Sequence, residues 1–364
     1  MKFVDEFRNG YYSKKIIKSI ENMTDRKINI MEVCGTHTMS IFKYGLNDVL
    51  PSNIKLISGP GCPVCVTPEN YIDAAIKLSH IENVIIATFG DMMKVPGKTS
   101  SLMERKSEGS DIRIVYSPMD ALILAKKNPF KNIIFLSVGF ETTTPMTAVT
   151  AIEAKNNNIK NLFFLTSHKL VIPVLKNLLE DKEINIDAFL LPGHVSAIIG
   201  EKPYSFLCDN YKISGVITGF EAADMLISIK IILQLIHNNT PKIINGYKRV
   251  VKYDGNINAL KYIEKVFKVV DSNWRGFGVI AKSGYELNEN YEMFDAMKHF
   301  KIELPNCTKI SKCKCSDILK GKITPIQCEL FQKICTPENP VGPCMVSSEG
   351  TCAAYYKYHN WRLR

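Results

Sequence analysis

The chain has 364 residues, 46% of them hydrophobic, which is enough for two or three packed units rather than one small core. Its formal net charge is +10, but the lysines are scattered without blocks or interleaved aromatic residues, so we do not expect nucleic-acid binding. The most apolar run, 225–236, contains Lys230 and is too short to span a bilayer, and the first residues lack a secretory signal, so we expect a cytoplasmic protein without a membrane anchor.

The N-terminal residues 1–27 are predicted to contain an amphipathic helix from Phe3 to Met23. The apolar residues of this helix are Phe3, Phe7, Ile16, Ile17 and Ile20. An exposed apolar stripe needs a partner, and we expect this helix to pack on the C-terminal domain.

Residues 28–237 alternate between short β-branched runs and helical patterns, every 20 to 30 residues. Nearly continuous apolar strands separated by helices are typical of parallel sheets that are covered on both faces. The sequence therefore predicts the α/β class. The predicted strands are 28–33, 54–57, 84–88, 112–115, 133–138, 162–165, 188–191 and 216–218.

A weak internal repeat predicts two similar parallel-sheet lobes, because a strand followed by Gly-Phe-Glu occurs at 135–141 and again at 216–221. We place α/β domain I, with Cys34 and the Cys62/Cys65 pair, at residues 28–130 and α/β domain II at 131–239. After residue 240 the alternation fades, although a helix is expected at 258–269. Residues 240–364 are predicted to form a third, mostly helical or irregular domain, which contains the C-terminal cysteines.

Cys34 follows the first predicted strand and opens the motif Cys34-Gly35-Thr36-His37-Thr38 before a helix. A cysteine at a helix N-terminus has its thiolate stabilised by the dipole and by free N–H groups, which makes it a better nucleophile and metal ligand. The alternative for a lone cysteine is a small buried apolar residue. The neighbouring glycine and His37 favour the functional interpretation.

Cys62 and Cys65 form a C-x-x-C motif after the second strand, in Gly59-Pro60-Gly61-Cys62-Pro63-Val64-Cys65. Thr67, Pro68 and Glu69 suit the start of a helix, so we expect the helix to begin two residues beyond Cys65. Such a pair can close and reopen a small disulfide ring, as in thioredoxin-like sites. Half of a zinc site is the alternative, but the chain has no second C-x-x-C to complete it.

Two further motifs lie at strand-to-helix junctions, where ligands collect in α/β sheets. Gly139-Phe140-Glu141-Thr142-Thr143 places the Glu141 carboxylate beside hydroxyl groups, although the threonines also suit a helix cap. Gly193-His194-Val195-Ser196 places His194 at a similar junction, although a single histidine is often structural. We retain Glu141 and His194 as candidates.

The C-terminal cysteines Cys313, Cys328, Cys335 and Cys352 have the spacing C-x14-C-x6-C-x16-C. Structural zinc sites usually have two C-x2-C pairs, which this spacing lacks. A 4Fe-4S cluster accepts thiolates from widely spaced loops and fits better. The sequence does not decide between Cys313 and Cys315 as the first ligand, or whether Cys344 takes part.

Taken together, these motifs resemble the HypD family of hydrogenase maturation factors. The resemblance covers nearly the whole chain in order. It rests on Cys34-Gly35-Thr36-His37-Thr38, 59–65, Thr88-Phe89-Gly90-Asp91-Met92, Gly139-Phe140-Glu141-Thr142-Thr143, Gly193-His194-Val195-Ser196, Cys335-Thr336-Pro337-Glu338 and 343–350.

The resemblance implies a scaffold that, with the small chaperone HypC, holds an iron atom while two cyanides and one carbon monoxide are attached. HypE is the implied cyanide donor, and the large subunit of a nickel-iron hydrogenase is the implied recipient, reached through HypC. Two α/β domains and a third domain with a 4Fe-4S cluster are also implied.

The local chemistry is compatible with this role. Cys34 is the candidate iron ligand, shared with a HypC cysteine, because soft thiolates suit low-spin iron. His37, Glu141 and His194 are candidates for positioning or proton handling, and Cys62 and Cys65 for electron supply.

The sequence does not decide whether the protein is an enzyme, and it leaves two other functions open. One is an iron-sulfur-linked thiol-disulfide oxidoreductase that acts on another protein. The other is a structural iron-sulfur protein whose remaining cysteines only pack in the core.

Overall fold

The computed structural model describes residues 10–303 and 312–359, and it contains two β-sheets with helices on their faces. The first sheet, sheet A, has the strand order β2-β1-β7-β8-β9, and all its strand pairs are parallel. Its strands are β1 (Ile28–Glu32), β2 (Ile54–Ser58), β7 (Ala188–Pro192), β8 (Ser214–Thr218) and β9 (Ile243–Asn245).

The second sheet, sheet B, has the order β10-β11-β6-β5-β3-β4, with β3 to β6 parallel and β10 and β11 antiparallel. Each of the eight predicted strands is present, so the predicted α/β class is confirmed. The strands of sheet B are β3 (Val84–Thr88), β4 (Ile112–Ile114), β5 (Asn132–Gly139), β6 (Leu162–Lys169), β10 (Phe267–Trp274) and β11 (Gly278–Leu287).

The predicted domain boundary near residue 130 does not separate the two sheets. The chain forms β1 and β2 in sheet A, then β3 to β6 in sheet B, and returns to sheet A with β7 to β9. The prediction assumed that consecutive strands are neighbours, which is the common case. Residues 240–364 are likewise not one unit, because β9 extends sheet A while β10 and β11 extend sheet B.

Helices cover both faces of sheet A. One face packs on α2 (Gly35–Tyr44) and α12 (Ala222–His237) through a cluster that includes Ile30, Ile41 and Leu226. The other face packs on α10 (Gly193–Ile199) and α11 (Phe206–Tyr211), through residues such as Phe189 and Leu207.

The N-terminal helix α1 (Gly10–Ile20) packs against α12, not on the C-terminal segment as predicted. Ile20 is fully buried there, and Ile16 and Ile17 pack on the same apolar cluster. The apolar stripe was recognised, but such a stripe does not specify its partner. Phe3 and Phe7 lie outside the described residues.

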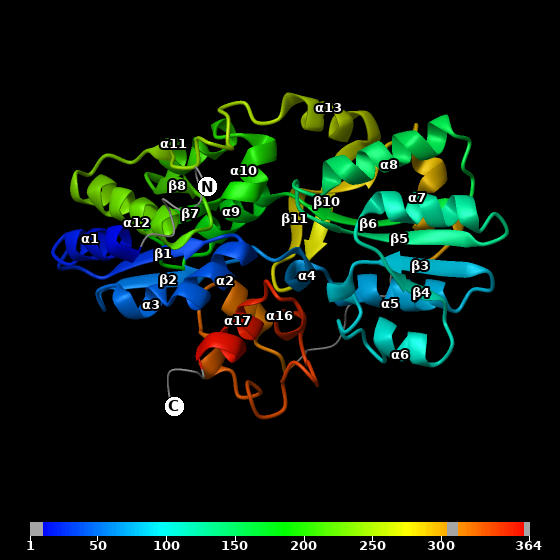
Figure 1. The fold of residues 1–364 in the computed structure, drawn as a ribbon, viewed down its shortest axis with the longest axis horizontal. Coiled ribbons are helices and arrows are strands. Elements are labelled where there is room, and N and C mark those ends of the chain that lie inside the picture. Colours follow the sequence, from blue (N-terminus) through cyan, green and yellow to red (C-terminus); the bar gives the residue numbers. More distant parts are fainter. Residues whose placement is uncertain (1–9, 304–311, 360–364) are drawn as a thin grey trace.

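Sheet B is covered by α5 (Glu69–Ser79) and α9 (Val171–Glu180) on one face. The other face is covered by α7 (Pro118–Lys127), α8 (Thr144–Asn156) and α13 (Ile257–Val266). Alternate strand residues point to opposite faces, so Ile133 packs in one cluster and Ile134 in the other. Figure 1 shows the two sheets side by side along the long axis of the molecule.

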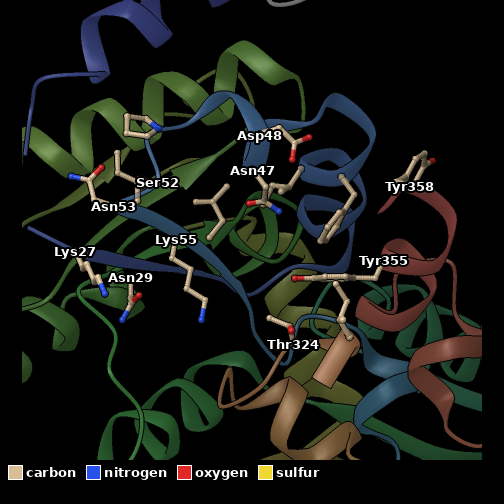
Figure 2. A pocket seen from close by; sticks show the side chains of 16 residues that line it. Lys27, Asn29, Asn47, Asp48, Ser52, Asn53, Lys55, Thr324, Tyr355 and Tyr358 are labelled. Atoms are coloured by element: carbon tan, nitrogen blue, oxygen red, sulfur yellow. The ribbon is translucent and has the colours of Figure 1, made fainter. Parts of the chain in front are cut away.

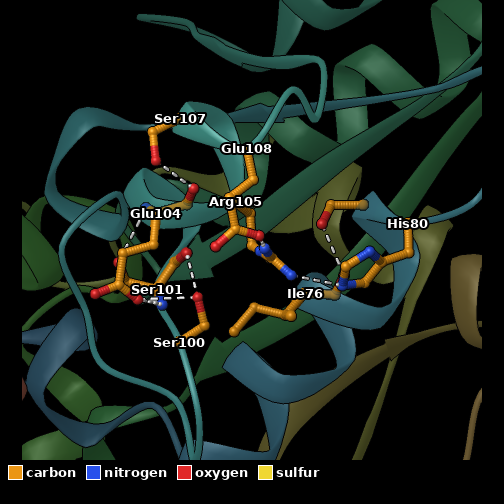
Figure 3. Close-up of polar contacts among 9 residues, drawn as sticks. Ile76, His80, Ser100, Ser101, Glu104, Arg105, Ser107 and Glu108 are labelled. Carbon is orange, nitrogen blue, oxygen red and sulfur yellow. Dashed lines mark hydrogen bonds and ion pairs between the residues drawn. The ribbon is translucent and has the colours of Figure 1, made fainter.

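The short helix α6 (Leu102–Ser107) is fixed by local polar contacts (Figure 3). Ser101 and Glu104 form a capping box, with Ser101 Oγ accepting from Glu104 N at 3.3 Å. Arg105 contacts Glu108 and His80. In the preceding loop the N–H of Lys98 donates to Asp73 Oδ1 at 2.7 Å, so the Asp73 carboxylate holds the backbone of this loop.

The C-terminal segment, residues 312–359, lies below the junction of the two sheets in Figure 1. Its helix α17 packs on α2, and α16 packs on α4 (Pro63–Val66). Its cysteines share one apolar core with Met31 of sheet A and Ile134 of sheet B, so the segment is built into the junction. The helices of this segment are α15 (Cys315–Leu319), η5 (Pro325–Gln327), α16 (Pro343–Val346) and α17 (Thr351–His359).

None of the helices formed by residues 10–303 and 312–359 combines the length and the apolar character that a membrane span needs.

Candidate functional site

Cys34 lies at the carboxyl end of β1, as the N-cap residue of α2, with extended backbone angles. Its N–H donates to Glu32 Oε2 at 3.0 Å, and Thr38 Oγ1 donates to the other oxygen of the same carboxylate. Glu32 is buried, and burial raises the pKa of its carboxyl to about 7. Glu32 therefore stabilises the turn around Cys34 by accepting both of these hydrogen bonds.

The turn with Cys34 and the turn with Cys62 are in direct contact. The N–H of Gly35 donates to the carbonyl of Gly61 at 2.9 Å. A Cβ atom at Gly61 would lie 2.2 Å from the Cys34 nitrogen and 2.4 Å from its Cα. Only a glycine permits this approach, and the structure thus brings two predicted thiol motifs together.

Cys62 and Cys65 form a disulfide, with their Cα atoms 5.3 Å apart and both residues buried. Cys62 is the N-cap of the one-turn helix α4, and the N–H of Cys65 approaches Cys62 Sγ at 3.2 Å. We expected the helix to begin beyond Cys65; instead Pro63, at the first helical position, starts α4 there, and the predicted helix follows as α5 from Glu69.

The Cys34 thiol is protonated at neutral pH in the isolated chain. Burial, and after it the charge of Glu349, raises the pKa of this thiol to about 12. The N–H groups of His37 and Thr36 lower the pKa, as expected at a helix N-terminus, but by less. The stabilised thiolate expected from the helix dipole is therefore not found, and a metal ion that binds Cys34 would displace a proton.

The C-terminal segment covers the turn around Cys34. Thr36 Oγ1 donates to Glu349 Oε1 at 2.6 Å, and a Cβ at Gly35 would lie 2.4 Å from Glu349 Cβ. Two residues earlier, Ser347 Oγ donates to Asp91 Oδ2 at 3.1 Å. Asp91 lies in η2 (Gly90–Met92) after β3, so this contact joins the segment to sheet B as well.

His37 and His194 both pack against the ring of Phe220, with centroid distances of 4.9 Å and 4.0 Å. His37 Nε2 donates to the carbonyl of Gly219 at 3.1 Å, while its buried Nδ1 has no partner among the described residues. Burial lowers the pKa of His37 to about 4, so this ring is neutral and Nδ1 is an acceptor. Burial also lowers the pKa of His194.

Glu141 follows β5 of sheet B and is buried. Its Oε1 accepts from the N–H of Val171 at 2.9 Å, and its buried Oε2 has no partner among the described residues. Burial raises the pKa of this carboxyl to about 7. The hydroxyl of Thr144 bonds to the carbonyl of Phe140, so the threonine helps to start α8 while Glu141 is left for another role.

Tyr204 is a further buried polar residue at the motif with Ser196, and no sequence pattern indicated it. It is fully buried in η3 (Lys202–Tyr204), and its hydroxyl lies 3.1 Å from Ser196 Oγ. Burial raises the pKa of this phenol, and the charges of Glu141 and Cys34 both act on it. The phenol of Tyr204 therefore lies within electrostatic reach of Glu141 on sheet B and of Cys34 on sheet A.

Six cysteines of the C-terminal segment lie in one apolar core. The thiol of Cys315 is hydrogen-bonded to Cys313 and to Cys344. Burial raises the pKa of the Cys352 thiol, and the thiols of Cys313, Cys315, Cys328 and Cys335 add to this effect. As they stand, no three His, Cys, Asp or Glu side chains within 10–303 and 312–359 form a group that could hold a metal ion.

A cavity of about 470 Å³ lies on the other side of α2, between the open edge of β2 and the C-terminal segment (Figure 2). Lys27, Lys55, Asn47 and Tyr355 are among the residues that line it. None of the predicted site residues lines this cavity, so it is separate from the thiol site.

The sequence analysis did not single out Glu32, Glu349 or Tyr204. A single acid in an otherwise apolar strand could have indicated Glu32, because a buried carboxylate needs partners. Glu349 lies within the motif at 343–350, but its contact with Thr36 depends on the tertiary fold. Tyr204 lies in a stretch without any recognisable pattern.

Comparison with known proteins agrees with these motifs. A family model described as "HypD: Hydrogenase formation hypA family" matches residues 11–359. The chain belongs to the HypD family. It is 44% identical over 366 residues to "Hydrogenase maturation factor HypD" of Escherichia coli (strain K12), which covers 98% of each chain.

Two other relatives match this HypD-family chain over nearly its full length. A putative hydrogenase expression/formation protein of Methanocaldococcus jannaschii is 47% identical over 349 residues, 95% of this chain and 96% of the relative. "Hydrogenase maturation factor HypD2" of Bradyrhizobium diazoefficiens is 40% identical, over 100% of this chain and 98% of its own.

Proposed function

We propose that this HypD-family protein is a hydrogenase maturation factor that, with HypC, holds an iron atom during attachment of two cyanides and one carbon monoxide. HypE is the proposed cyanide donor, and HypC the proposed carrier to the hydrogenase large subunit. The observation that supports this most is the direct contact between the Cys34 turn and the Cys62–Cys65 turn through Gly35 and Gly61.

In this proposal Cys34 is the ligand that the chain supplies to the iron. Its sulfur is a soft donor in a largely buried place, which suits iron that carries strong-field ligands. Binding would release the thiol proton to solvent, and the positive charge of the iron would offset the cost that burial imposes on the thiolate. The HypC cysteine is the proposed second thiolate.

Three buried polar atoms of the predicted motifs and of β8 have no partner among the described residues and are available for the diatomic ligands. A cyanide nitrogen accepts hydrogen bonds, and Glu141 in its protonated form can donate from Oε2, which has no partner among the described residues. Thr218 Oγ1, at the end of β8, is also buried and without a partner there, and His37 Nδ1 offers an acceptor. These groups would orient the ligands and hold protons during transfer.

The C-terminal thiols are proposed to hold a 4Fe-4S cluster through Cys313, Cys328, Cys335 and Cys352. The donor set fits in its chemistry, because six thiols share one apolar core, although the thiols must move together to bind. A Cβ at Gly342 would lie 2.5 Å from Cys313 Sγ, so a glycine leaves space beside this sulfur. When bound, the cluster would supply single electrons. Cys315 and Cys344 remain alternative ligands.

The alternative function, a thiol-disulfide oxidoreductase that acts on another protein, needs a sulfur that the other protein can reach. Cys62 is 2% exposed and Cys65 is fully buried, which disfavours attack from outside. Turnover of a protein disulfide by the isolated chain would favour this alternative.

Infrared spectroscopy of the anaerobic complex with HypC tests the proposal. We expect cyanide and carbonyl stretches in the complex, and their loss in Cys34→Ser. Cys208→Ser is the matched control, since Cys208 is a half-buried cysteine of α11 with no contact to the site motifs among its described bonds. A complex that matures hydrogenase but shows no such bands would overturn the scaffold, and bands that persist in Cys34→Ser would exclude Cys34 as the ligand.

A further inference from the structure

The tip of the β10–β11 hairpin, residues 274–278, contacts the helix that contains the disulfide. The N–H of Arg275 donates to the carbonyl of Val66 at 2.8 Å, and Arg275 Nε donates to the carbonyl of Thr67 at 2.8 Å. These two carbonyls lie at the C-terminal end of α4, where helix carbonyls lack partners within the helix. Arg275 therefore caps the C-terminal end of α4, the helix whose N-cap is Cys62.

The same tip contacts the C-terminal segment on its other side. Ser316 Oγ donates to the carbonyl of Gly276 at 2.8 Å, and a Cβ at Gly276 would lie 2.9 Å from Ser316 Cα. Ser316 follows Cys315 directly in the chain. The guanidinium of Arg275 also acts electrostatically on the thiols of Cys313, Cys315 and Cys344.

The tip is held firmly by the rest of sheet B. The buried Lys169 amine donates to the carbonyl of Asn273 at 2.9 Å, and Trp274 Nε1 donates to Ser283 Oγ at 2.9 Å. Trp274 is fully buried. A displacement of α4 is thus passed to Arg275 rather than absorbed by a loose loop.

One nitrogen of Arg275 is left over. Nη2 is buried and has no hydrogen-bond partner among the described residues, while Nε and the backbone N–H are used. A buried guanidinium nitrogen without an acceptor is costly. An anionic sulfur in the C-terminal segment would satisfy it.

From these contacts we propose that Arg275 is a positioning residue that couples the oxidation state of the Cys62–Cys65 pair to the cysteines of the C-terminal segment. The effect of Arg275 on the disulfide follows from its contacts with α4. Its effect on a cluster rests on the proposed function.

The redox step is the reversible opening of the ring. The Sγ–Sγ bond between Cys62 and Cys65 breaks, and two electrons and two protons enter from a dithiol such as dithiothreitol, which closes its own disulfide. The contacts of Arg275 with α4 are made in the closed-ring form. Loss of a contact that stabilises this form shifts the equilibrium toward the reduced pair.

The first experiment measures the equilibrium between the ring and dithiothreitol in the full chain, by thiol alkylation and mass spectrometry at fixed pH. For Arg275→Gln we expect an equilibrium constant for reduction that is about 10-fold larger, since a hydrogen bond from a charged group typically stabilises by an amount of this size. Arg275→Lys should lie between the two. Arg113→Gln, at the far edge of sheet B, is the control and should match the wild type.

The second experiment needs the protein loaded with iron and sulfide. We expect the midpoint potential of the cluster to differ between the intact ring and a Cys62→Ser/Cys65→Ser background, and this difference to shrink in Arg275→Gln and in Ser316→Ala. Ser316→Ala removes only the hydroxyl that donates to the Gly276 carbonyl and keeps the arginine. This variant therefore tests the coupling even if Arg275→Gln folds poorly.

An unchanged ring equilibrium in Arg275→Gln would overturn the proposal, and so would an equal shift of the cluster potential in all these proteins. Failure to bind iron at all counts against the proposed cluster and leaves the first experiment decisive for Arg275. The two ideas can therefore fail separately.

Discussion

The hydroxyl of Thr36 donates to the carboxylate of Glu349 at 2.6 Å, across 313 residues of chain. This bond fixes the C-terminal segment on the turn that positions Cys34. Glu349 also raises the pKa of the Cys34 thiol through its charge. The C-terminal segment is thus part of the thiol site and also contains the six cysteines of the shared apolar core.

Loss of the Thr36 hydroxyl should loosen this contact. We expect Thr36→Val to destabilise docking of residues 343–358 by about 1.5–3 kcal/mol, the usual range for a hydrogen bond to a charged group. Hydrogen exchange of amides in α16 and α17 should become faster, with little change in α8. Thr240→Val, at an exposed threonine, serves as the control; equal exchange in both variants would mean that Glu349 is held by other contacts.

A side chain at Gly61 should disrupt the contact between the two thiol turns. In Gly61→Ala the new Cβ would lie 2.2 Å from the Cys34 nitrogen, so backbone must move. We expect a loss of at least about 2 kcal/mol in the free energy of unfolding, measured by denaturant titration. Gly10→Ala, where no atom lies within 4 Å of the new Cβ, should cost nothing, and a Gly61→Ala protein as stable as that control would contradict the close contact.

The buried carboxyl of Glu141 predicts a pH dependence of stability. Its pKa is about 7 in the folded protein against an ordinary value of 4.5, so the folded state binds the proton more tightly. Stability from this group is complete below pH 4.5 and is lost as the pH rises through 7, by about 3 kcal/mol.

Glu141→Gln has no proton to lose, while the amide oxygen can still accept from Val171. The variant should therefore gain stability relative to the wild type between pH 4.5 and pH 7, in denaturant titrations at a series of pH values. A difference between the two proteins that stays constant over this range would show that Glu141 is ionised in the folded state.

Single serine variants should identify the cluster ligands. In Cys328→Ser, Cys335→Ser and Cys352→Ser we expect loss of iron, of acid-labile sulfide and of visible absorbance in anaerobic protein. Cys313→Ser and Cys315→Ser decide which of these two cysteines is the first cluster ligand, since only substitution of the ligand should cause this loss. Iron content unaffected by all five substitutions would show that these thiols do not bind it.

Strand positions followed directly from the sequence because each buried strand is a short apolar run. Val84–Thr88, for example, is buried at every position, and such a run has few other interpretations. The thiol turns were also predictable, since a parallel strand leads its next residues to the carboxyl edge of the sheet. Cys34, Cys62 and His194 all lie at such edges.

The division of strands between the sheets could not be predicted, because an apolar run records burial and not its neighbours. The β10–β11 hairpin was missed for a different reason. In β10 only Phe267 and Trp274 are buried, and polar residues at 268 and 271–273 interrupt its apolar residues, so the strand lacks a continuous apolar run. The proposed role of Arg275 depends on this hairpin, so it could not be predicted from the sequence either.

The path of the chain has a consequence for its synthesis on the ribosome. Strands β1 and β2 emerge early but must wait for β7, since sheet A is completed only after sheet B has begun. Thr36 in turn must wait until residue 349 has left the exit tunnel. A nascent chain therefore lacks the contact between Thr36 and Glu349 at the Cys34 turn until nearly all of its residues have been synthesised.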